Sequence, residues 1–246
     1  MFTFDKAPLT VMLQCQNPET AIDRIQKSLP LGADAFGLQV ESLEKQYQNK
    51  ETIQSVFKEM QGKPVYVTNY RKANNTSDSD EQLAEGMVQL AAWGADLVDV
   101  MGDLFCPHPQ ELTDDEEAIE KQMQLIDRIH RQGAQGLMSS HVLKYTSAEE
   151  VLRIALEQQR RGADVVKIVT KAETMEQQLE NLRITHLLKQ ELSVPFLFLS
   201  GGGSGLHRRI GPNLGACMYL CVFEHDEFST KAQPLLEHLK PIRDNM

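Results

Sequence analysis

The sequence predicts a (β/α)8 barrel, and three observations support this fold class. Short apolar runs that favour β-strands alternate with amphipathic helical stretches along the chain. The runs are almost continuously apolar, which is typical of parallel strands buried on both faces. Eight such units fit into 246 residues without a low-complexity linker. We therefore expect one domain over residues 1–246. The alternative is a doubly wound open sheet, but that fold would need a glycine-rich turn after its first strand, and "MLQCQNPET" contains no glycine.

Each expected strand is a short run of β-branched, aromatic and other apolar residues. The eight runs are residues 9–14, 34–40, 64–69, 95–101, 136–141, 163–170, 194–200 and 216–223. Helical patterns such as "SAEEVLRIALEQQRR" lie between them, and Gly-Ala-Asp follows three of these helices. We expect each of these glycines to end its helix in the left-handed conformation before the next strand begins.

The composition argues against two classes of partner. Hydrophobic residues make up 41% of the chain and charged residues 24%, and the net charge is −10. Because nucleic acid and anionic membranes require a basic surface, we expect neither as a partner. No stretch reaches the roughly 20 consecutive apolar residues of a membrane helix. The N-terminus lacks the features of a signal peptide and the four cysteines form no CxxC pair, so we expect a cytoplasmic protein.

Two side chains stand out at the C-terminal ends of the strands, where such barrels place their active sites. Lys167 lies in the middle of the apolar run "ADVVKIVT". An amine without a counter-ion in that interior would favour its neutral form, which can attack a carbonyl and form a Schiff base. His141 ends the preceding strand and is suited to proton transfer. The alternatives are a lysine that points outward between helices and a histidine without a catalytic role.

The sequence favours an anion site over a metal site. "SGGGSG" (200–205) follows the seventh strand and offers backbone N–H groups, and Arg209 would complete a phosphate or carboxylate site there. A mobile loop without a ligand is the alternative. A metal centre lacks support, because the sequence has neither an HExxH motif nor an HxH motif after the first strand. We expect neither a metal nor an organic cofactor.

With these residues in place, the chain resembles type I 3-dehydroquinate dehydratase, a Schiff-base enzyme of the shikimate pathway in aromatic amino acid biosynthesis. The likeness covers nearly the whole chain. The segments that are similar to those of the family are "GADAFGLQVESL", "PVYVTNYRK", "ADLVDVM", "LMSSHVLKYT", "ADVVKIVTKAET", "SGLHRRIGPNLGACMYLC" and "STKAQP".

The resemblance implies a role for each matching residue. Lys167 would form the imine, His141 would be the general acid and base, and Asp99 would orient the histidine. The residues that would bind the substrate lie at other strand ends and in loops, with Arg209 holding the substrate carboxylate. They are Arg209, Gln233, Ser229, Arg71, Gln39 and Glu41.

The second strand departs from the family pattern. The family's Glu-Trp-Arg-x-Asp run falls here on residues 37–41, so Gly37 and Gln39 replace its glutamate and its arginine, and Glu41 replaces the aspartate. A glutamine lacks the charged fork of an arginine. Contacts to substrate hydroxyls discriminate strongly between substrates, so these losses should change the accepted molecule more than the reaction.

The third strand departs as well. The family's arginine there matches Arg71 if one residue is inserted, and it falls on Tyr70 without the insertion. The glutamate that assists the family's histidine falls on Asn74 or Asn75, and neither side chain titrates. The partner of His141 is therefore unassigned unless Asp99 takes that place.

Together these residues predict a carbon–oxygen lyase that converts 3-dehydroquinate to 3-dehydroshikimate and water through a covalent imine. A divergent member would accept another carboxylated hydroxy-ketone. One alternative is a class I aldolase acting on a phosphorylated or carboxylated ketone, and another is a catalytically inactive barrel that binds a metabolite. Apart from the small-molecule substrate we expect a second copy of the chain as partner, in a homodimer.

Overall fold

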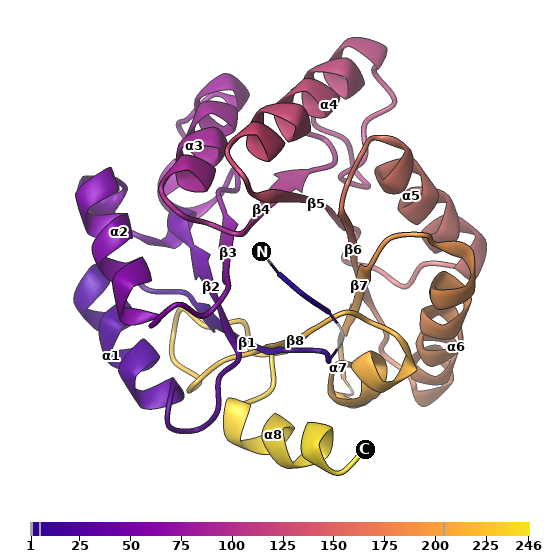
Figure 1. Ribbon diagram of the computed structural model, residues 1–246. Helices are drawn as coiled ribbons and strands as arrows, with labels where there is room; N and C mark the ends of the chain where they lie inside the picture. Colours follow the sequence, from indigo (N-terminus) through magenta and orange to yellow (C-terminus); the bar gives the residue numbers. More distant parts are fainter. Residues whose placement is uncertain (1, 5, 204) are drawn as a thin grey trace.

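The computed structural model describes residues 2–4, 6–203 and 205–246. Its eight strands form one parallel sheet in the order β7-β6-β5-β4-β3-β2-β1-β8. The two ends of this order, β7 and β8, also meet. The Cys217 N–H, two residues before β8, donates a backbone hydrogen bond to the Phe196 carbonyl of β7 at 2.7 Å. Figure 1 shows the strands around a central axis and the helices in an outer ring. The predicted (β/α)8 barrel is confirmed.

All eight predicted strands are present, and only their ends differ from the expected bounds. The strands are β1 (Leu9–Leu13), β2 (Ala35–Gln39), β3 (Val65–Thr68), β4 (Leu97–Met101), β5 (Gln135–His141), β6 (Val165–Lys171), β7 (Phe196–Gly201) and β8 (Tyr219–Cys221). The α-helices are α1 (Pro18–Ser28), α2 (Lys50–Glu59), α3 (Asp80–Ala92), α4 (Glu116–Arg131), α5 (Ala148–Arg160), α6 (Met175–Glu191), α7 (Leu206–Ile210) and α8 (Leu236–Asp244). Short 3-10 helices are η1 (Val40–Ser42), η2 (Lys45–Tyr47), η3 (Ala73–Asn75) and η4 (Gly211–Leu214).

The Gly-Ala-Asp repeat ends three helices and also fixes three strands. Its glycines have φ angles of +89°, +117° and +90°, the left-handed region in which glycine avoids the steric penalty of a side chain. The carboxylates of Asp34, Asp96 and Asp164 each accept a hydrogen bond, at 2.7–3.0 Å, from a backbone N–H at the start of the preceding strand. One tripeptide therefore ends a helix and sets the relative height of two neighbouring strands.

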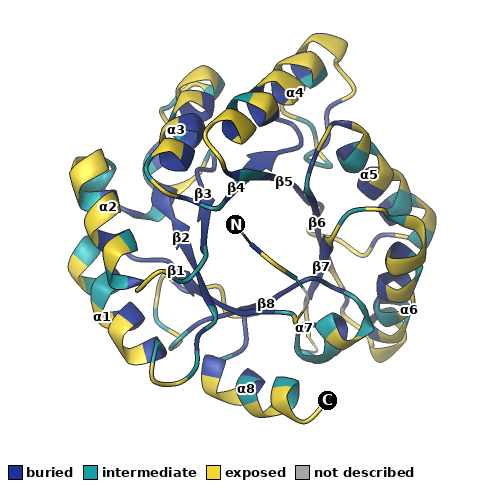
Figure 2. Cartoon of the chain, viewed as in Figure 1, coloured by how far each residue is buried: buried dark blue, intermediate teal, exposed yellow. Residues whose placement is uncertain are grey.

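The barrel has an inner and an outer apolar layer. Inside the ring, Met12, Tyr66, Leu137 and Leu197 belong to one buried cluster. Outside it, the strands pack against the apolar faces of the helices, whose opposite faces are exposed (Figure 2). None of the described helices is both long and apolar enough to cross a membrane.

The N-terminal segment closes one end of the barrel. Figure 1 shows this segment crossing the middle of the ring. Phe2 is 3% exposed and belongs to the inner cluster, and its N–H donates a hydrogen bond to the side chain of Gln135, the first residue of β5. Side chains therefore fill the barrel at the N-terminal ends of the strands. The pocket lies at the opposite end, where the strands finish.

Candidate active site

A pocket of about 530 Å³ lies at the C-terminal ends of the strands. Its lining includes both residues predicted to carry the chemistry, Lys167 and His141. Positively charged side chains outnumber the two carboxylates that line it, Asp103 and Glu111, although the whole chain has a net charge of −10. This local positive charge suits an anionic substrate. The lysine and arginine residues of the lining are Arg71, Lys72, Lys167, Lys171 and Arg208.

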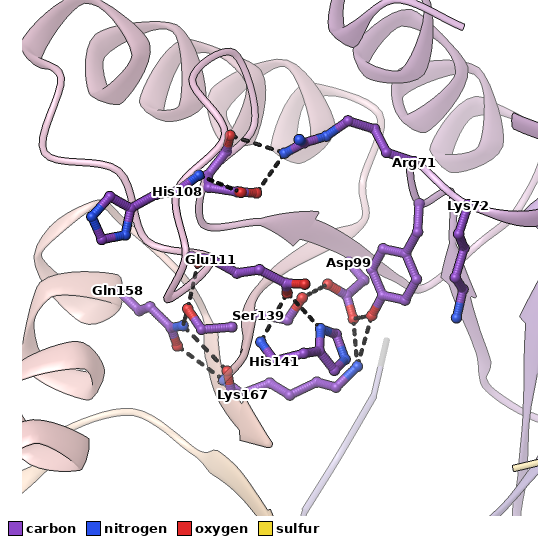
Figure 3. A network of polar contacts seen from close by, with 12 residues as sticks. Arg71, Lys72, Asp99, His108, Glu111, Ser139, His141, Gln158 and Lys167 are labelled. Carbon is purple, nitrogen blue, oxygen red and sulfur yellow. Dashed lines mark hydrogen bonds and ion pairs between the residues drawn. The ribbon is translucent and has the colours of Figure 1, made fainter. Parts of the chain in front are cut away.

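Lys167 extends from the middle of β6 toward the barrel interior, and its side chain is 5% exposed. Its Nζ donates a hydrogen bond to Asp99 at 2.9 Å (Figure 3). It also donates to the hydroxyls of Tyr70 at 2.7 Å and Tyr66 at 3.0 Å. The expectation that Lys167 lacks a counter-ion is wrong, because Asp99 of β4 lies beside it. Attack on a carbonyl needs the lone pair of an amine, so an ammonium paired with Asp99 must first release a proton.

Asp99 is fully buried and accepts hydrogen bonds on both carboxylate oxygens. Burial raises its pKa, but the charge of Lys167 and the hydrogen bonds from Ser139, Tyr66 and Tyr70 outweigh burial and lower the pKa below its usual value. Asp99 is therefore a carboxylate that faces Lys167. The sequence placed it beside His141 as the residue that orients the ring, and the structure gives that position to another acid.

Glu111 is the partner of His141. Its Oε2 lies 2.7 Å from the ring Nδ1 and 2.8 Å from the backbone nitrogen of His141. Burial raises the pKa of Glu111, but the hydrogen bond from His141, the charge of its ring and the charge of Lys167 together lower it. Because a carboxylate only accepts hydrogen bonds, Nδ1 carries the proton in this pair, and Nε2 is left to exchange a proton with a substrate.

Sequence reasoning missed Glu111 because the residue lies in the loop between β4 and α4, far from the third strand where the resemblance placed the acid. No periodicity or motif marks this loop. The one available signal was the order of the strands: the loop that follows β4 must pass the end of β5, where His141 stands.

Arg71 lines the pocket, as predicted, but its guanidinium is engaged by two acids. It donates to Asp103 at 2.5 Å and forms an ion pair with Asp80 at 3.1 Å. Asp103 belongs to the same loop as Glu111, so Arg71 holds that loop against the end of β3. Its predicted role in gripping the substrate remains untested.

The two consecutive arginines of α7 point to different places. Arg209, the predicted carboxylate clamp, donates to the Gly205 carbonyl at 2.8 Å and lines a neighbouring pocket of about 370 Å³ rather than the main one. Arg208 lines the main pocket, and its Nε donates to the Ser200 carbonyl at 2.9 Å. Ser204, part of the glycine-rich loop predicted to bind an anion, lies outside the described residues.

Arg208 is the better placed of the two for an anion. It is 8% exposed, and burial lowers its pKa to about 10. In the part of the chain that the structure describes, no carboxylate forms an ion pair with it. A buried guanidinium whose charge lacks a partner is strongly stabilised by an anionic ligand.

The predicted residues of the second strand separate in the structure. Gln39 lines the pocket, and its Oε1 accepts a hydrogen bond from Gln14 at 3.1 Å. Glu41 is fully buried outside the pocket lining, where it accepts hydrogen bonds from Thr68 and, at 3.4 Å, from the backbone N–H of Tyr70. Burial raises the pKa of Glu41. Glu41 thus supports the end of β3. Its position outside the pocket lining does not favour a direct contact with a substrate.

Met12 occupies the space beside Gly37. A Cβ atom placed on Gly37 would lie 2.2 Å from the Met12 sulfur and 3.1 Å from a ring carbon of Tyr66. Met12 also lines the pocket. The position where the family pattern has a glutamate is therefore covered by a thioether, which presents an apolar surface to the substrate.

The loop before α8 closes over one side of the pocket. Gln14, just after β1, donates to the Thr230 hydroxyl at 2.9 Å and accepts from its N–H at 2.7 Å. This double contact brings Gln233 into the pocket lining, where its buried Oε1 has no partner among the described residues. Ser229 is buried within the loop, bonded to Asp226, and does not line the pocket.

The chain is similar to known proteins in sequence and in fold. Residues 9–242 match the family described as type I 3-dehydroquinase. The curated 3-dehydroquinate dehydratase of Alkaliphilus oremlandii is 33% identical over 101 residues, a stretch that covers 40% of this chain and 38% of that protein. The aligned part thus spans less than half the length of this relative.

Two solved structures show the same fold. A type I 3-dehydroquinate dehydratase from Clostridium difficile, solved with covalently modified comenic acid, has a TM-score of 0.82 at 16% identity and covers 100% of this chain and 94% of its own. The 3-dehydroquinate dehydratase of Geobacillus kaustophilus has a TM-score of 0.83 at 14% identity and covers 98% of this chain and 91% of its own. With a family match across nearly the whole barrel, the chain belongs to the type I 3-dehydroquinase family.

Proposed function

We propose that this protein is a carbon–oxygen lyase that dehydrates 3-dehydroquinate, or a closely related carboxylated hydroxy-ketone, through an imine on Lys167. The observation that carries this proposal is the buried amine of Lys167 in the pocket lining, together with a histidine–glutamate pair and other positively charged side chains. Membership of the type I 3-dehydroquinase family supports it.

The chemistry follows from the order of the groups. The Lys167 nitrogen, once deprotonated, adds to the ketone carbon, and loss of water gives an iminium ion. Nε2 of His141 then removes a proton from the carbon next to the iminium, which yields an enamine. The enamine electrons expel the β-hydroxyl group, which takes the proton back from His141 and leaves as water. Hydrolysis of the remaining iminium ion releases the unsaturated ketone and restores the lysine.

Glu111 orients His141 and stabilises its charged form, which supports both proton transfers. It fixes the ring by accepting from Nδ1 and from the backbone of His141, and its negative charge stabilises the imidazolium ion that forms when Nε2 takes a proton. An analogous acid on the third strand is absent from this chain, where Asn74 and Asn75 stand. Glu111 thus supplies the function from a different loop.

Arg208 and the apolar part of the pocket set the expected specificity. Arg208 supplies the positive charge for the substrate carboxylate. Gly37 and Gln39 stand where the family pattern has charged groups, and Met12 fills the space beside Gly37. We therefore expect a preference for substrates with fewer hydroxyl groups than 3-dehydroquinate. The preferred substrate keeps the carboxylate and a hydroxyl β to the ketone.

Trapping of the imine tests the proposal. The protein would be incubated with 3-dehydroquinate, and in parallel with less hydroxylated carboxylated ketones, in the presence of borohydride. We expect one reduced adduct of substrate mass on the peptide that contains Lys167. Lys167→Ala should abolish it, whereas Lys171→Ala, which removes an exposed pocket-lining lysine, should keep it.

The outcomes separate the candidate functions. A trapped adduct together with an unsaturated product of dehydration supports the lyase. A trapped adduct with carbon–carbon cleavage would indicate a class I aldolase, and no adduct with any ketone would indicate an inactive metabolite-binding barrel. An adduct on Lys144 or Lys171 would overturn the assignment of Lys167.

Other expectations from the sequence stay predictions. Among the described residues, no cluster of three or more His, Cys, Asp or Glu side chains is arranged to hold a metal ion, and catalysis without a metal or organic cofactor remains our proposal. We further propose a cytoplasmic protein that forms a homodimer and has no nucleic acid partner. Size-exclusion chromatography with light scattering would test the dimer.

A further inference from the structure

Two tyrosines of the third strand and its following loop bring their hydroxyls to the same nitrogen. Lys167 Nζ donates to Tyr70 at 2.7 Å and to Tyr66 at 3.0 Å, and both phenols donate to Oδ2 of Asp99. Their surroundings differ. Tyr66 is completely buried in the inner cluster below the pocket, whereas Tyr70 lines the pocket itself.

Tyr70 also touches the second catalytic group. Its ring meets the ring of His141 edge to face, with centroids 5.4 Å apart, and the Lys72 Nζ lies 4.9 Å from the centroid of the Tyr70 ring. The N–H of Tyr70 donates to the buried carboxylate of Glu41. The phenol is therefore fixed between the amine and the imidazole, at the wall against which a substrate carbonyl would lie.

We propose that Tyr70 is a catalytic residue of imine formation, which passes a proton from the Lys167 nitrogen to the carbonyl oxygen of the substrate. This inference rests on the proposed Schiff-base function. It assigns Tyr70 a task separate from those of His141, which acts on the carbon next to the imine and on the leaving hydroxyl.

The proton transfers balance as follows. When the neutral amine adds to the ketone, the new carbon–nitrogen bond leaves a positive nitrogen with two hydrogens and a negative oxygen on the same carbon. The nitrogen gives one proton to the Tyr70 oxygen while the Tyr70 hydroxyl gives its own proton to the negative oxygen. The product is a neutral carbinolamine, and Tyr70 is a neutral phenol before and after the step.

The surroundings of Tyr70 favour this exchange over a permanent loss of its proton. Burial, followed by the negative charge of Asp99, raises the pKa of Tyr70 well above its ordinary value, so a phenolate is strongly disfavoured. Because Tyr70 would accept one proton while it releases another, its oxygen would never carry the negative charge of a phenolate. The hydroxyl can turn from Asp99 to the substrate oxygen, because a phenolic hydrogen rotates about its C–O bond.

Phenylalanine substitutions at the two tyrosines test the role, since each removes one hydroxyl from the same lysine and the same aspartate. The rate of formation of the borohydride-trappable adduct would be measured in a single turnover, and kcat and KM in the steady state. We expect Tyr70→Phe to slow adduct formation by about 100-fold with KM changed less than threefold. Tyr66→Phe, which acts on Asp99 and Lys167 from below the pocket, should slow it by less than tenfold.

The outcomes distinguish this inference from the proposed function. If the wild-type protein forms no adduct, the Schiff-base function itself fails. If the wild type forms the adduct and the two variants slow it equally, the hydroxyls merely hold Asp99, and the assignment of Tyr70 is wrong. A ring-fluorinated tyrosine at position 70 guards against a folding defect, because it restores the hydroxyl with a lower pKa. It should recover most of the rate lost in Tyr70→Phe, and failure to do so would also overturn the inference.

Discussion

His141 and Glu111 form a hydrogen-bonded pair, with Nδ1 2.7 Å from Oε2, although they come from successive strand–loop units. Figure 3 shows this pair next to the Lys167–Asp99 pair. Each basic group thus has its own carboxylate, and neither acid is shared. A substitution at one carboxylate therefore removes the partner of one basic group and keeps that of the other, although the charge of Lys167 also acts on Glu111.

Removal of the charge of Glu111 should slow the reaction. In Glu111→Gln the neutral amide no longer stabilises the imidazolium form of His141, so we expect kcat to fall by about 100-fold. Steady-state kinetics with the substrate found by trapping would measure it. Glu116→Gln, which changes an exposed acid at the start of α4, serves as the control and should leave kcat within twofold. A fall of less than threefold for Glu111→Gln would show that His141 works without this partner.

Arg161 holds both ends of the loop that carries Glu111. Its buried guanidinium donates to the carbonyls of Gly102 at 3.0 Å and Thr113 at 2.5 Å. Arg161→Met would leave the Thr113 carbonyl without this donor, whereas the Gly102 carbonyl would keep the hydrogen bonds from Gln122 and from the Thr113 N–H. We expect the free energy of unfolding to fall by about 2–4 kcal/mol. Urea denaturation would measure the change.

The adjacent arginine provides a matched control for Arg161. Arg160 bonds to the same carboxylate, Glu157, but its side chain is 61% exposed. We expect Arg160→Met to change the free energy of unfolding by about 0.5 kcal/mol or less, because exposed ion pairs contribute little. Equal losses in the two variants would contradict a specific role for Arg161 in holding the loop.

The close contact between Gly37 and Met12 predicts coupled effects on stability. Gly37→Ala places a methyl group against the Met12 sulfur and should cost about 1–3 kcal/mol of the free energy of unfolding. In a Met12→Ala background the same change should cost about 1 kcal/mol or less, since the nearest obstructing atoms are gone and only the Tyr66 ring carbon remains close, at 3.1 Å. A double-mutant cycle measured by thermal or urea unfolding checks this, and additive effects would refute the contact.

His207 should make stability depend on pH. The Thr185 hydroxyl donates to the Asn181 carbonyl, so the 2.8 Å contact between Thr185 and His207 requires Nε2 of the ring to be the donor. Nδ1 then carries no proton and has no partner among the described residues. Burial, with the charge of Arg208, lowers the pKa of His207 to about 4 from an ordinary value of 6.5.

The sign of the effect follows from the proton count. Between about pH 6.5 and pH 4 the unfolded chain binds a proton at His207 that the folded protein does not, so the free energy of unfolding should fall as the pH falls through this window. Below the window the contribution of His207 to this fall should end. His207→Gln keeps a side-chain N–H for Thr185 but cannot titrate, and its stability should decline less over this range. Parallel stability curves for wild type and variant would exclude His207 as the source.

The fold followed from the sequence because its signals are local. Apolar runs, helix patterns and the three Gly-Ala-Asp tripeptides each act within a few residues, and every predicted strand is present. The strand ends that face the pocket were predicted for the same reason, since the topology of the barrel places them together. Lys167 and His141 lie there as expected.

The partners of those two residues were decided by tertiary structure. Glu111 reaches His141 from an irregular loop whose path depends on Arg71 and Arg161, and no local pattern encodes that path. Arg208, and not Arg209, enters the pocket because a five-residue helix turns one of two neighbouring side chains inward. The sequence alone therefore determined which residues stand at the strand ends, whereas the direction of each side chain and the charge beside it came from contacts between distant segments.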